Sequence, residues 1–100
     1  MTEIKRVDFN QKEVVNCLKK IEGISVQHLH TIGKGCPDIL VGYAGHNYLY
    51  EIKSDGGTLT PSEEVFFRTW KGHVKVVFSA DEIIADIEGK TGIRLVVKPS

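Results

Sequence analysis

Residues 35–54, GCPDILVGYAGHNYLYEIKS, combine two short β-rich runs with three charged positions inside a segment that is otherwise largely apolar. A Gly-His pair separates the two runs, and this pattern predicts a β-hairpin. Asp38 opens the first strand directly after a proline, a residue that cannot serve in a central ladder. A short hairpin returns the end of its second strand, which carries Glu51 and Lys53, to the neighbourhood of Asp38. We therefore expect two carboxylates and an ammonium group to converge at one end of the hairpin.

Outward from this hairpin, the pattern of apolar and polar residues predicts a single α/β domain that covers residues 1–100. The expected strands are residues 24–32, 38–44, 47–53, 73–79 and 92–98, and the expected helices are residues 11–22, 61–71 and 80–88. A strand, helix, strand succession favours parallel pairing through a right-handed crossover, whereas the hairpin is antiparallel. The prediction is therefore a mixed central β-sheet flanked by helices, in the order αβββαβαβ.

Polar residues in capping positions mark the start of each predicted helix. Asn10 is the expected cap of the first helix. The second helix begins after Thr60, which is followed by a proline at the first helical position and by Glu63 at the capping-box position. Ser79 opens the third helix in a similar way, with a glutamate three residues later.

Composition restricts the class of protein. One hundred residues, of which 41% are hydrophobic and 26% charged, suit one soluble globular domain, and no apolar run approaches the roughly 20 residues of a membrane span. Cys17 and Cys36 match neither a disulfide framework nor a zinc pattern, so we expect free thiols in a reducing compartment. The N-terminal residues lack the apolar core of a secretory signal, and a cytoplasmic location is expected.

The distribution of charge confines any nucleic-acid contact to a local patch. The formal net charge is zero, which argues against binding through bulk positive charge. Residues 65–75 nevertheless carry Arg68, Lys71 and Lys75 and no acid, while residues 81–88 are acidic. These runs predict a basic side and an acidic side, although two solvated helix faces would have the same pattern.

The residue types at the end of the hairpin suit phosphodiester chemistry. Alternate strand residues share a face, so Glu51 and Lys53 are neighbours. Two carboxylates held together repel unless a cation lies between them, and Mg²⁺ prefers carboxylates, water and substrate phosphate as ligands. A lysine adds a compact positive charge that orients an attacking water or counters charge on a phosphate. The set predicts a metal-dependent phosphodiesterase. The alternative is a turn-capping Asp38 beside an exposed pair of charges on the neighbouring strand.

The same motif resembles that of the PD-(D/E)xK nuclease superfamily. A Pro-Asp pair at 37–38 is followed, after twelve residues, by EIK at 51–53. The segments GKGCPDILV and YEIKSDGGTLTPSE, and the helix followed by VKVVFSADEIIADI, are similar to the VRR-NUC branch, which includes small stand-alone proteins similar to Holliday-junction resolvases. The resemblance covers roughly residues 10–88 and implies a restriction-endonuclease-like core.

The resemblance also implies roles for individual residues. Asp38 and Glu51 would ligate Mg²⁺ or Mn²⁺ together with the backbone carbonyl of Ile52. Lys53 would orient the nucleophilic water. Glu13, on the first helix, matches the additional acid that many relatives place at the metal site. No organic cofactor is implied.

Two acids have alternative roles in their own helices. Glu13 has capping-box spacing from Asn10, so its function can be confined to its helix terminus. Glu63 stands where relatives commonly carry Gln, and helical spacing aligns it with Phe67 and Trp70 on an inward face. Its alternative is the capping-box partner of the residue that opens the helix.

Other residues around the motif are expected to contact DNA. The predicted DNA-binding residues are Lys34, Ser54, Thr58, Arg68 and Lys71. Lys34 lies between two glycines, which would let the backbone approach a phosphate closely or would form a flexible turn. For the aromatic residues, Trp70 included, a role in the core or in a dimer interface is favoured over base stacking.

The sequence therefore predicts a metal-dependent DNA endonuclease that hydrolyses phosphodiester bonds. By resemblance, its substrate is branched DNA such as Holliday junctions. A small domain without net charge is expected to act on two strands as a two-fold homodimer, with no membrane partner. One alternative is a module that grips structured DNA with little or no cleavage. Another is a nuclease that acts on RNA or on a different DNA geometry.

Overall fold

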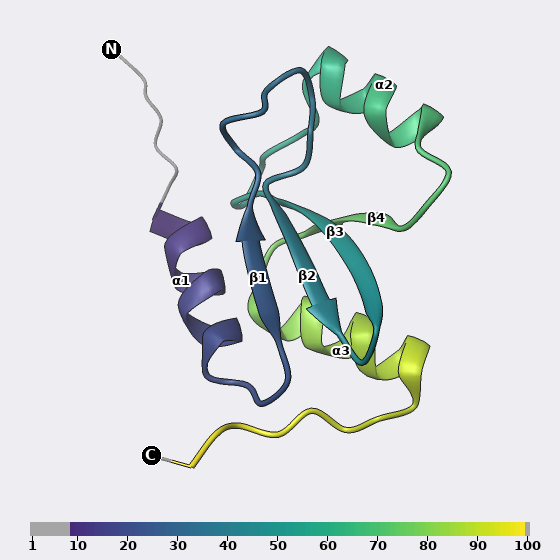
Figure 1. Ribbon diagram of the computed structural model, residues 1–100. Coiled ribbons are helices and arrows are strands. Elements are labelled where there is room, and N and C mark those ends of the chain that lie inside the picture. The colour runs from purple at the N-terminus through teal and green to yellow at the C-terminus, as the bar shows by residue number, and fades with distance from the viewer. Residues whose placement is uncertain (1–8, 100) are drawn as a thin grey trace.

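The computed structural model of the chain describes residues 9–99, which form three helices and one four-stranded mixed sheet (Figure 1). In chain order the elements are α1 (Phe9–Lys19), β1 (Ser25–His28), β2 (Ile39–Tyr43), β3 (His46–Ile52), α2 (Pro61–Thr69), β4 (Val74–Val77) and α3 (Ala80–Thr91). The strands lie side by side in the order β1-β2-β3-β4. The predicted mixed α/β architecture is therefore confirmed.

The central hairpin of β2 and β3 has the predicted antiparallel pairing, with its turn one residue earlier than expected. An Ala-Gly pair at 44–45 forms the turn with φ of 52° and 83°, and a tight type I′ turn requires positive φ at both central residues. Ile39 pairs with Tyr50, which fixes the register. Asp38, one residue before Ile39, therefore lies beside Glu51, one residue after Tyr50.

Strand β4 joins the sheet in parallel with β3, as the strand, helix, strand pattern predicts. Helix α2 forms the crossover between them. Ile52 pairs with Val77, and the N–H of Lys53 donates to the carbonyl of Val77 at 3.0 Å. The two strands thus end at the same edge of the sheet, and Lys53 is the first residue beyond that edge on β3.

Helices α1 and α3 pack against each other and against one face of the sheet (Figure 1). The buried apolar residues of this core are Val14, Val15, Leu18, Ile39, Val41, Tyr48, Tyr50, Ile52, Val77, Ala80, Ile83 and Ile87. Tyr48, Tyr50 and Ile52 alternate along β3, so they share the core face while Glu51 points to the other side. Helix α2 buries none of its residues and lies apart from this core.

A polar cluster beside Tyr50 connects β3, the start of β4 and α3. Asp86 accepts hydrogen bonds from Tyr50 Oη at 2.7 Å, from His73 Nε2 at 2.8 Å and from Lys90 Nζ at 2.6 Å. His73 Nδ1 accepts from the N–H of Leu49 at 3.1 Å, so the neutral ring carries its proton on Nε2. Burial acts to raise the pKa of Asp86, but the three donors outweigh it and lower the pKa to about 2.

The predicted fifth strand is wrong. Residues 92–98 run alongside the chain that follows α1, with one isolated bridge between Ile21 and Val97. Gly92, with φ of 73°, ends α3 in the left-handed conformation and turns the chain away from the sheet. Alternating apolar residues favour extended backbone there, but they do not specify which neighbour the segment pairs with. The observed order over residues 9–99 is αβββαβα.

Asn10 is not the cap of the first helix, which begins at Phe9 and ends at Lys19 rather than at residue 22. Its side-chain amide instead donates to the carbonyls of Lys53 at 2.9 Å and Phe78 at 3.4 Å. Asn10 therefore ties the start of α1 to the ends of β3 and β4. A polar residue near a helix start has the same sequence pattern whether its side chain caps the helix or reaches a neighbouring strand.

The other two predicted caps are confirmed. Thr60 Oγ1 accepts from the N–H of Glu63 at 3.3 Å, and the Glu63 side chain accepts from the N–H of Thr60 at 2.9 Å. Ser79 Oγ accepts from the N–H of Glu82 at 3.3 Å. The reciprocal bond of Glu82 goes to the N–H of Phe78, one residue before the expected donor.

Several boundaries differ from those predicted. Strand β1 covers Ser25–His28 rather than 24–32, α2 ends at Thr69 and α3 extends to Thr91. The longest described helix, α3, has 12 residues. None of the helices within residues 9–99 is long and apolar enough to cross a membrane.

Replacing Asp86 with Asn tests the polar cluster. The Asp86 side chain is 7% exposed and its pKa is about 2, below the ordinary 3.8, so its charge stabilises the folded state above pH 3.8 and loses this contribution as the pH falls towards 2. We expect Asp86→Asn to lower the free energy of unfolding by about 1 to 2 kcal/mol at pH 7, and by about half as much at pH 3. Urea unfolding at both pH values measures the difference. Equal differences would contradict a contribution from the charge.

Candidate functional site

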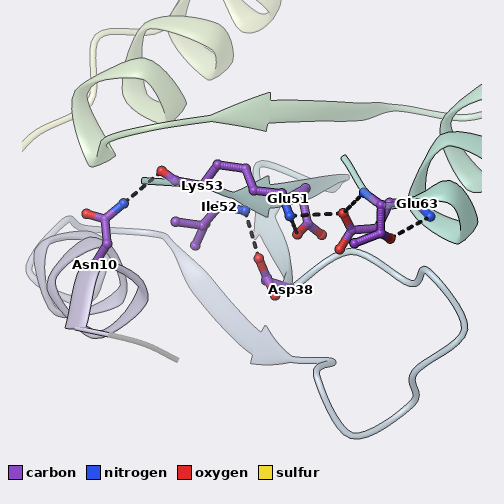
Figure 2. Close-up of polar contacts among 7 residues, drawn as sticks. Asn10, Asp38, Glu51, Ile52, Lys53 and Glu63 are labelled. Carbon is purple, nitrogen blue, oxygen red and sulfur yellow. Dashed lines mark hydrogen bonds and ion pairs between the residues drawn. The ribbon is translucent and has the colours of Figure 1, made fainter. Parts of the chain in front are cut away.

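The structure brings Asp38, Glu51 and Lys53 together at the edge of the sheet where β3 ends (Figure 2). Asp38 lies just before β2, and its Oδ2 accepts a hydrogen bond from the N–H of Ile52 at 2.8 Å. Glu51 Oε2 lies 3.3 Å from Lys53 Nζ. The antiparallel register and the two-residue alternation of a strand therefore produce the convergence expected from the sequence.

Lys53 is held at its side chain by two carboxylates. Its Nζ donates to Glu63 Oε1 at 2.9 Å and lies 3.3 Å from Glu51 Oε2. Figure 2 shows the lysine side chain reaching between these two acids. An ammonium group has three donors, so one N–H of Lys53 is left for a water or a phosphate oxygen.

The backbone of Lys53 is fixed as well. Its N–H donates to the carbonyl of Val77 at 3.0 Å, and its carbonyl accepts from Asn10 Nδ2 at 2.9 Å. Strand β4 and helix α1 thus hold the main chain while the carboxylates hold the side chain. Asn10 is a site residue that sequence reasoning assigned to a different role, because its spacing from the helix start matches a cap.

Glu63 serves its helix and the site with the same atom. Its Oε1 accepts from the N–H of Thr60 and from Lys53 Nζ, both at 2.9 Å. The two roles predicted for Glu63 are therefore compatible, and the capping box of α2 sets the position of a carboxylate beside the lysine. Glu63 faces inward as expected, with a side chain that is 16% exposed, but Trp70, which helical spacing aligns with it, is 46% exposed.

Glu51 carries the clearest sign of an incomplete site. The residue is 3% exposed, and its Oε1 has no hydrogen-bond partner among residues 9–99. Burial, followed by the negative charges of Asp38 and Glu63, raises the pKa of Glu51 to about 8. A buried carboxylate oxygen without a partner is costly, and most such atoms in folded proteins are satisfied.

The pKa values of the neighbouring groups are also shifted, by burial and by the interactions of these groups with one another. Burial raises the pKa of Asp38, although the hydrogen bond from Ile52 opposes it. Burial acts to lower the pKa of Lys53, but the bond to Glu63 and the nearby carboxylates outweigh it and raise that pKa. Burial acts to raise the pKa of Glu63, but the bonds from its helix cap and from Lys53 lower it. Lys53 and Glu63 therefore form a charged pair.

This donor set fits one divalent cation. Three carboxylates and one ammonium leave a formal charge of −2 when all four groups are ionised. Within residues 9–99 no three His, Cys, Asp or Glu side chains form a ready-made metal cage. Mg²⁺ does not need one, because it keeps several waters and is bound through one or two carboxylates and a substrate phosphate. Asp38 and Glu51 supply two such carboxylates, one of them with an unpartnered oxygen.

For two of the predicted metal ligands, Glu13 and the carbonyl of Ile52, the structure gives less direct support. Glu13 is exposed on α1, in a groove that it shares with Ser79 and Asp81 at the start of α3. No described contact joins Glu13 to Asp38 or Glu51, so its metal role stays a prediction. Ile52 belongs to the site through its N–H, and the role of its carbonyl also stays a prediction.

The predicted DNA-binding residues lie on exposed segments of the chain. Lys34, Ser54, Thr58, Arg68 and Lys71 are all exposed. Lys34 has φ of 56° between two glycines that also have positive φ, so this loop is a defined turn. A Cβ atom on Gly35 would lie 2.3 Å from the carbonyl oxygen of Ser62, which shows that the loop packs tightly on the first turn of α2.

Cys36 is a neighbour of the site that the sequence did not indicate. Both cysteines are free, as predicted, but Cys36 is half-buried. Burial, with the negative charges of Glu51 and Asp38, raises the pKa of its thiol. The neutral thiol therefore adds no charge to the site.

Comparisons of the chain with protein-family models, with curated proteins and with solved structures found no match. The resemblance to PD-(D/E)xK nucleases thus remains a prediction.

Replacing Glu51 with Gln tests the cost of the buried carboxylate. Its pKa is raised from 4.5 to about 8, so the folded state favours the neutral form and loses stability as the pH rises from 4.5 through 8. With chelator at pH 8.5, we expect Glu51→Gln to increase the free energy of unfolding by about 1 to 3 kcal/mol. At pH 4.5 the two proteins should have similar stability. Urea unfolding provides the measurement, and a less stable variant at pH 8.5 would rule out a strained carboxylate.

Proposed function

We propose that this protein is a divalent-metal-dependent endonuclease of the PD-(D/E)xK type, similar to the VRR-NUC branch, with a restriction-endonuclease-like core. The observation that carries the proposal is the buried Glu51 oxygen without a partner, next to Asp38 and to a lysine with a free donor. This combination of two carboxylates and one lysine suits hydrolysis of a phosphodiester bond.

The groups that would hold Mg²⁺ or Mn²⁺ are the carboxylates of Asp38 and Glu51, together with the carbonyl of Ile52. When bound, such an ion supplies Lewis-acid stabilisation of the charge that develops on a scissile phosphate. It would also give the orphaned oxygen of Glu51 a partner and cancel the formal charge of the cluster.

The residues of the chain perform the positioning. Lys53, charged and fixed at both its backbone and its side chain, donates its remaining N–H to the attacking water or to a phosphate oxygen. Asn10 holds the Lys53 carbonyl, and Glu63 holds its Nζ. Since each of these contacts comes from a different element, the lysine has one defined position relative to the carboxylates.

The proposed substrate is DNA, with branched duplexes such as Holliday junctions as the preferred geometry by resemblance. The protein has no net positive charge to attract DNA, so local contacts to the phosphates would come from exposed basic residues, namely Lys34, Arg68 and Lys71. A two-fold homodimer in the cytoplasm would present two sites to two strands.

A second candidate is a module that binds structured DNA without cutting it. The observation that favours it is the engagement of Lys53 by two carboxylates at once, which leaves one donor free. A nuclease acting on RNA or on another DNA geometry would use the same site. These candidates differ in their response to metal and to polymer, which one assay measures.

The assay incubates the purified protein with labelled four-way junction, flap, linear duplex and single-stranded DNA, and with RNA, in Mg²⁺, Mn²⁺ or chelator. We expect cutting only with metal, and most efficiently on the junction. Lys53→Ala should bind the junction normally but cut at least about 100-fold more slowly, because it removes a positioned donor of the transition state.

The matched control is Lys19→Ala, which removes an exposed lysine on α1 far from the carboxylates along the helix. It should cut at the wild-type rate. Tight junction binding without metal-dependent cutting would favour the binding module. Unchanged cutting by Lys53→Ala would remove the lysine from the mechanism.

Metal binding itself is measurable without substrate. A ligand that binds only the folded state stabilises it by about 2.7 kcal/mol at a hundredfold excess over its dissociation constant. We expect Mg²⁺ or Mn²⁺ to raise the melting temperature of the wild type but not of Asp38→Asn or Glu51→Gln. A shift that persists in both variants would place the ion elsewhere.

A further inference from the structure

The C-terminal end of α2 presents an exposed aromatic pair. The rings of Phe66 and Trp70 are stacked, with centroids 4.9 Å apart and an interplanar angle of 18°. Trp70 is nevertheless 46% exposed, and α2 buries none of its residues. The edge of the indole lies against Gly72, where a Cβ atom would be 3.0 Å from Nε1. Phe66 and Gly72 thus hold the indole in place while much of its surface faces solvent.

Three basic residues lie near this aromatic pair in the sequence: Arg68 on α2, Lys71 directly after Trp70, and Lys75 on β4. Arg68, Lys71 and Lys75 are exposed, and the structure shows no ion pair for any of them within residues 9–99. Residues 65–75 contain no acid. We call Phe66, Trp70 and these three basic residues the α2 patch. An exposed stacking surface in a basic stretch of the chain is complementary to a nucleic-acid strand, in which nucleobases alternate with phosphates.

A second copy of the chain is a poorer occupant of this surface. In a two-fold dimer with the α2 patch on the axis, the patch of one protomer would face the same patch of its partner. The basic residues of one protomer, Arg68, Lys71 and Lys75, would then approach the same residues of its partner. Residues 65–75 contain no acid that would compensate these charges. Like charges brought together in this way disfavour the pairing.

We propose that the α2 patch binds an unpaired stretch of the nucleic acid, with a base stacked on Trp70 and neighbouring phosphates at Arg68, Lys71 and Lys75. The inference rests on the proposed nuclease for the identity of the polymer. Glu63, at the other end of α2, contacts the candidate active-site lysine. At 1.5 Å per residue, Glu63 and Trp70 are about 10 Å apart along the helix, on the order of three base-pair steps. The protein would therefore prefer substrates with unpaired bases a few nucleotides from the cleaved bond.

The experiment uses the intrinsic fluorescence of Trp70, which is the single tryptophan of the chain. The wild-type protein is titrated in chelator with oligothymidylate and with a blunt duplex of equal length. We expect oligothymidylate to quench the emission and to bind more tightly than the duplex, because only unpaired bases can stack on the indole. Absence of quenching, or equal affinity for both, would overturn the proposal.

Variants separate stacking from charge. Trp70→Ala should weaken oligothymidylate binding roughly 5- to 100-fold, whereas Trp70→Phe should retain most of the affinity, as measured by anisotropy of a labelled oligonucleotide. Replacing Arg68, Lys71 and Lys75 with Gln should reduce the slope of log affinity against log salt by about 2. The charge-matched control replaces the exposed residues Lys19, Lys20 and Lys98 with Gln and should leave the slope unchanged.

Two outcomes distinguish this inference from the nuclease proposal. Oligothymidylate binding that depends on Trp70, in a protein that never cuts DNA, would support the patch and contradict the nuclease. Metal-dependent cutting by the wild type, together with unaltered oligothymidylate binding by Trp70→Ala, would support the nuclease and contradict the patch. Emission that changes with protein concentration in the absence of DNA would show that a second copy covers Trp70, and it would overturn the proposed occupant.

Discussion

The candidate site depends on one constraint, the register of the β2–β3 hairpin. The two-residue turn at 44–45, with both residues at positive φ, pairs Ile39 with Tyr50 and so sets Asp38 beside Glu51. A slip of one residue would reverse the faces of β3. Tyr50 would leave the core, and Glu51 would enter it. Core packing and site geometry therefore specify the same register, which makes the position of the carboxylates as firm as the hydrophobic core itself.

The candidate site combines a lysine whose hydrogen-bonding groups are mostly paired with a glutamate that keeps an unpaired buried oxygen. Lys53 has partners for its N–H, its carbonyl and two of its ammonium donors, drawn from α1, β3, β4 and α2. Glu51, two residues earlier, keeps a buried oxygen without a partner and an elevated pKa. A folded protein tolerates such a group where the surrounding core supplies the stability. The tyrosine–aspartate–histidine cluster between β3 and α3 is one such source, since it ties the core-facing side of β3 to the helix.

Local sequence patterns predicted much of this structure. The errors occur where a residue or segment contacts a part of the chain that is distant in the sequence. The hairpin, the parallel crossover and the caps at Thr60 and Ser79 depend on residues close in sequence, and all are confirmed. The roles of Asn10 and of residues 92–98 depend on which distant segment lies nearby, which spacing alone does not specify. The convergence of the acids and the lysine was predictable because one hairpin contains them. The contact of Glu63 with Lys53 was open, since its spacing matches a cap equally well.

Helix α2 lies outside the core, with one end tied to the candidate site and an exposed tryptophan at the other end. Its residues are half-buried or exposed, and Trp70 at its C-terminal end is 46% exposed, so core packing does not account for this tryptophan. Its first turn is tied to the sheet through Glu63 and Lys53 and rests against the Gly35 loop. At its C-terminal end Phe66 stacks on Trp70, close in the sequence to Arg68 and Lys71. In the proposed complex, the length of α2 would set the spacing between its aromatic pair and the carboxylates. If the protein is the proposed nuclease, a nucleic-acid strand stacked on Trp70 would place a phosphate a few nucleotides away beside Asp38 and Glu51.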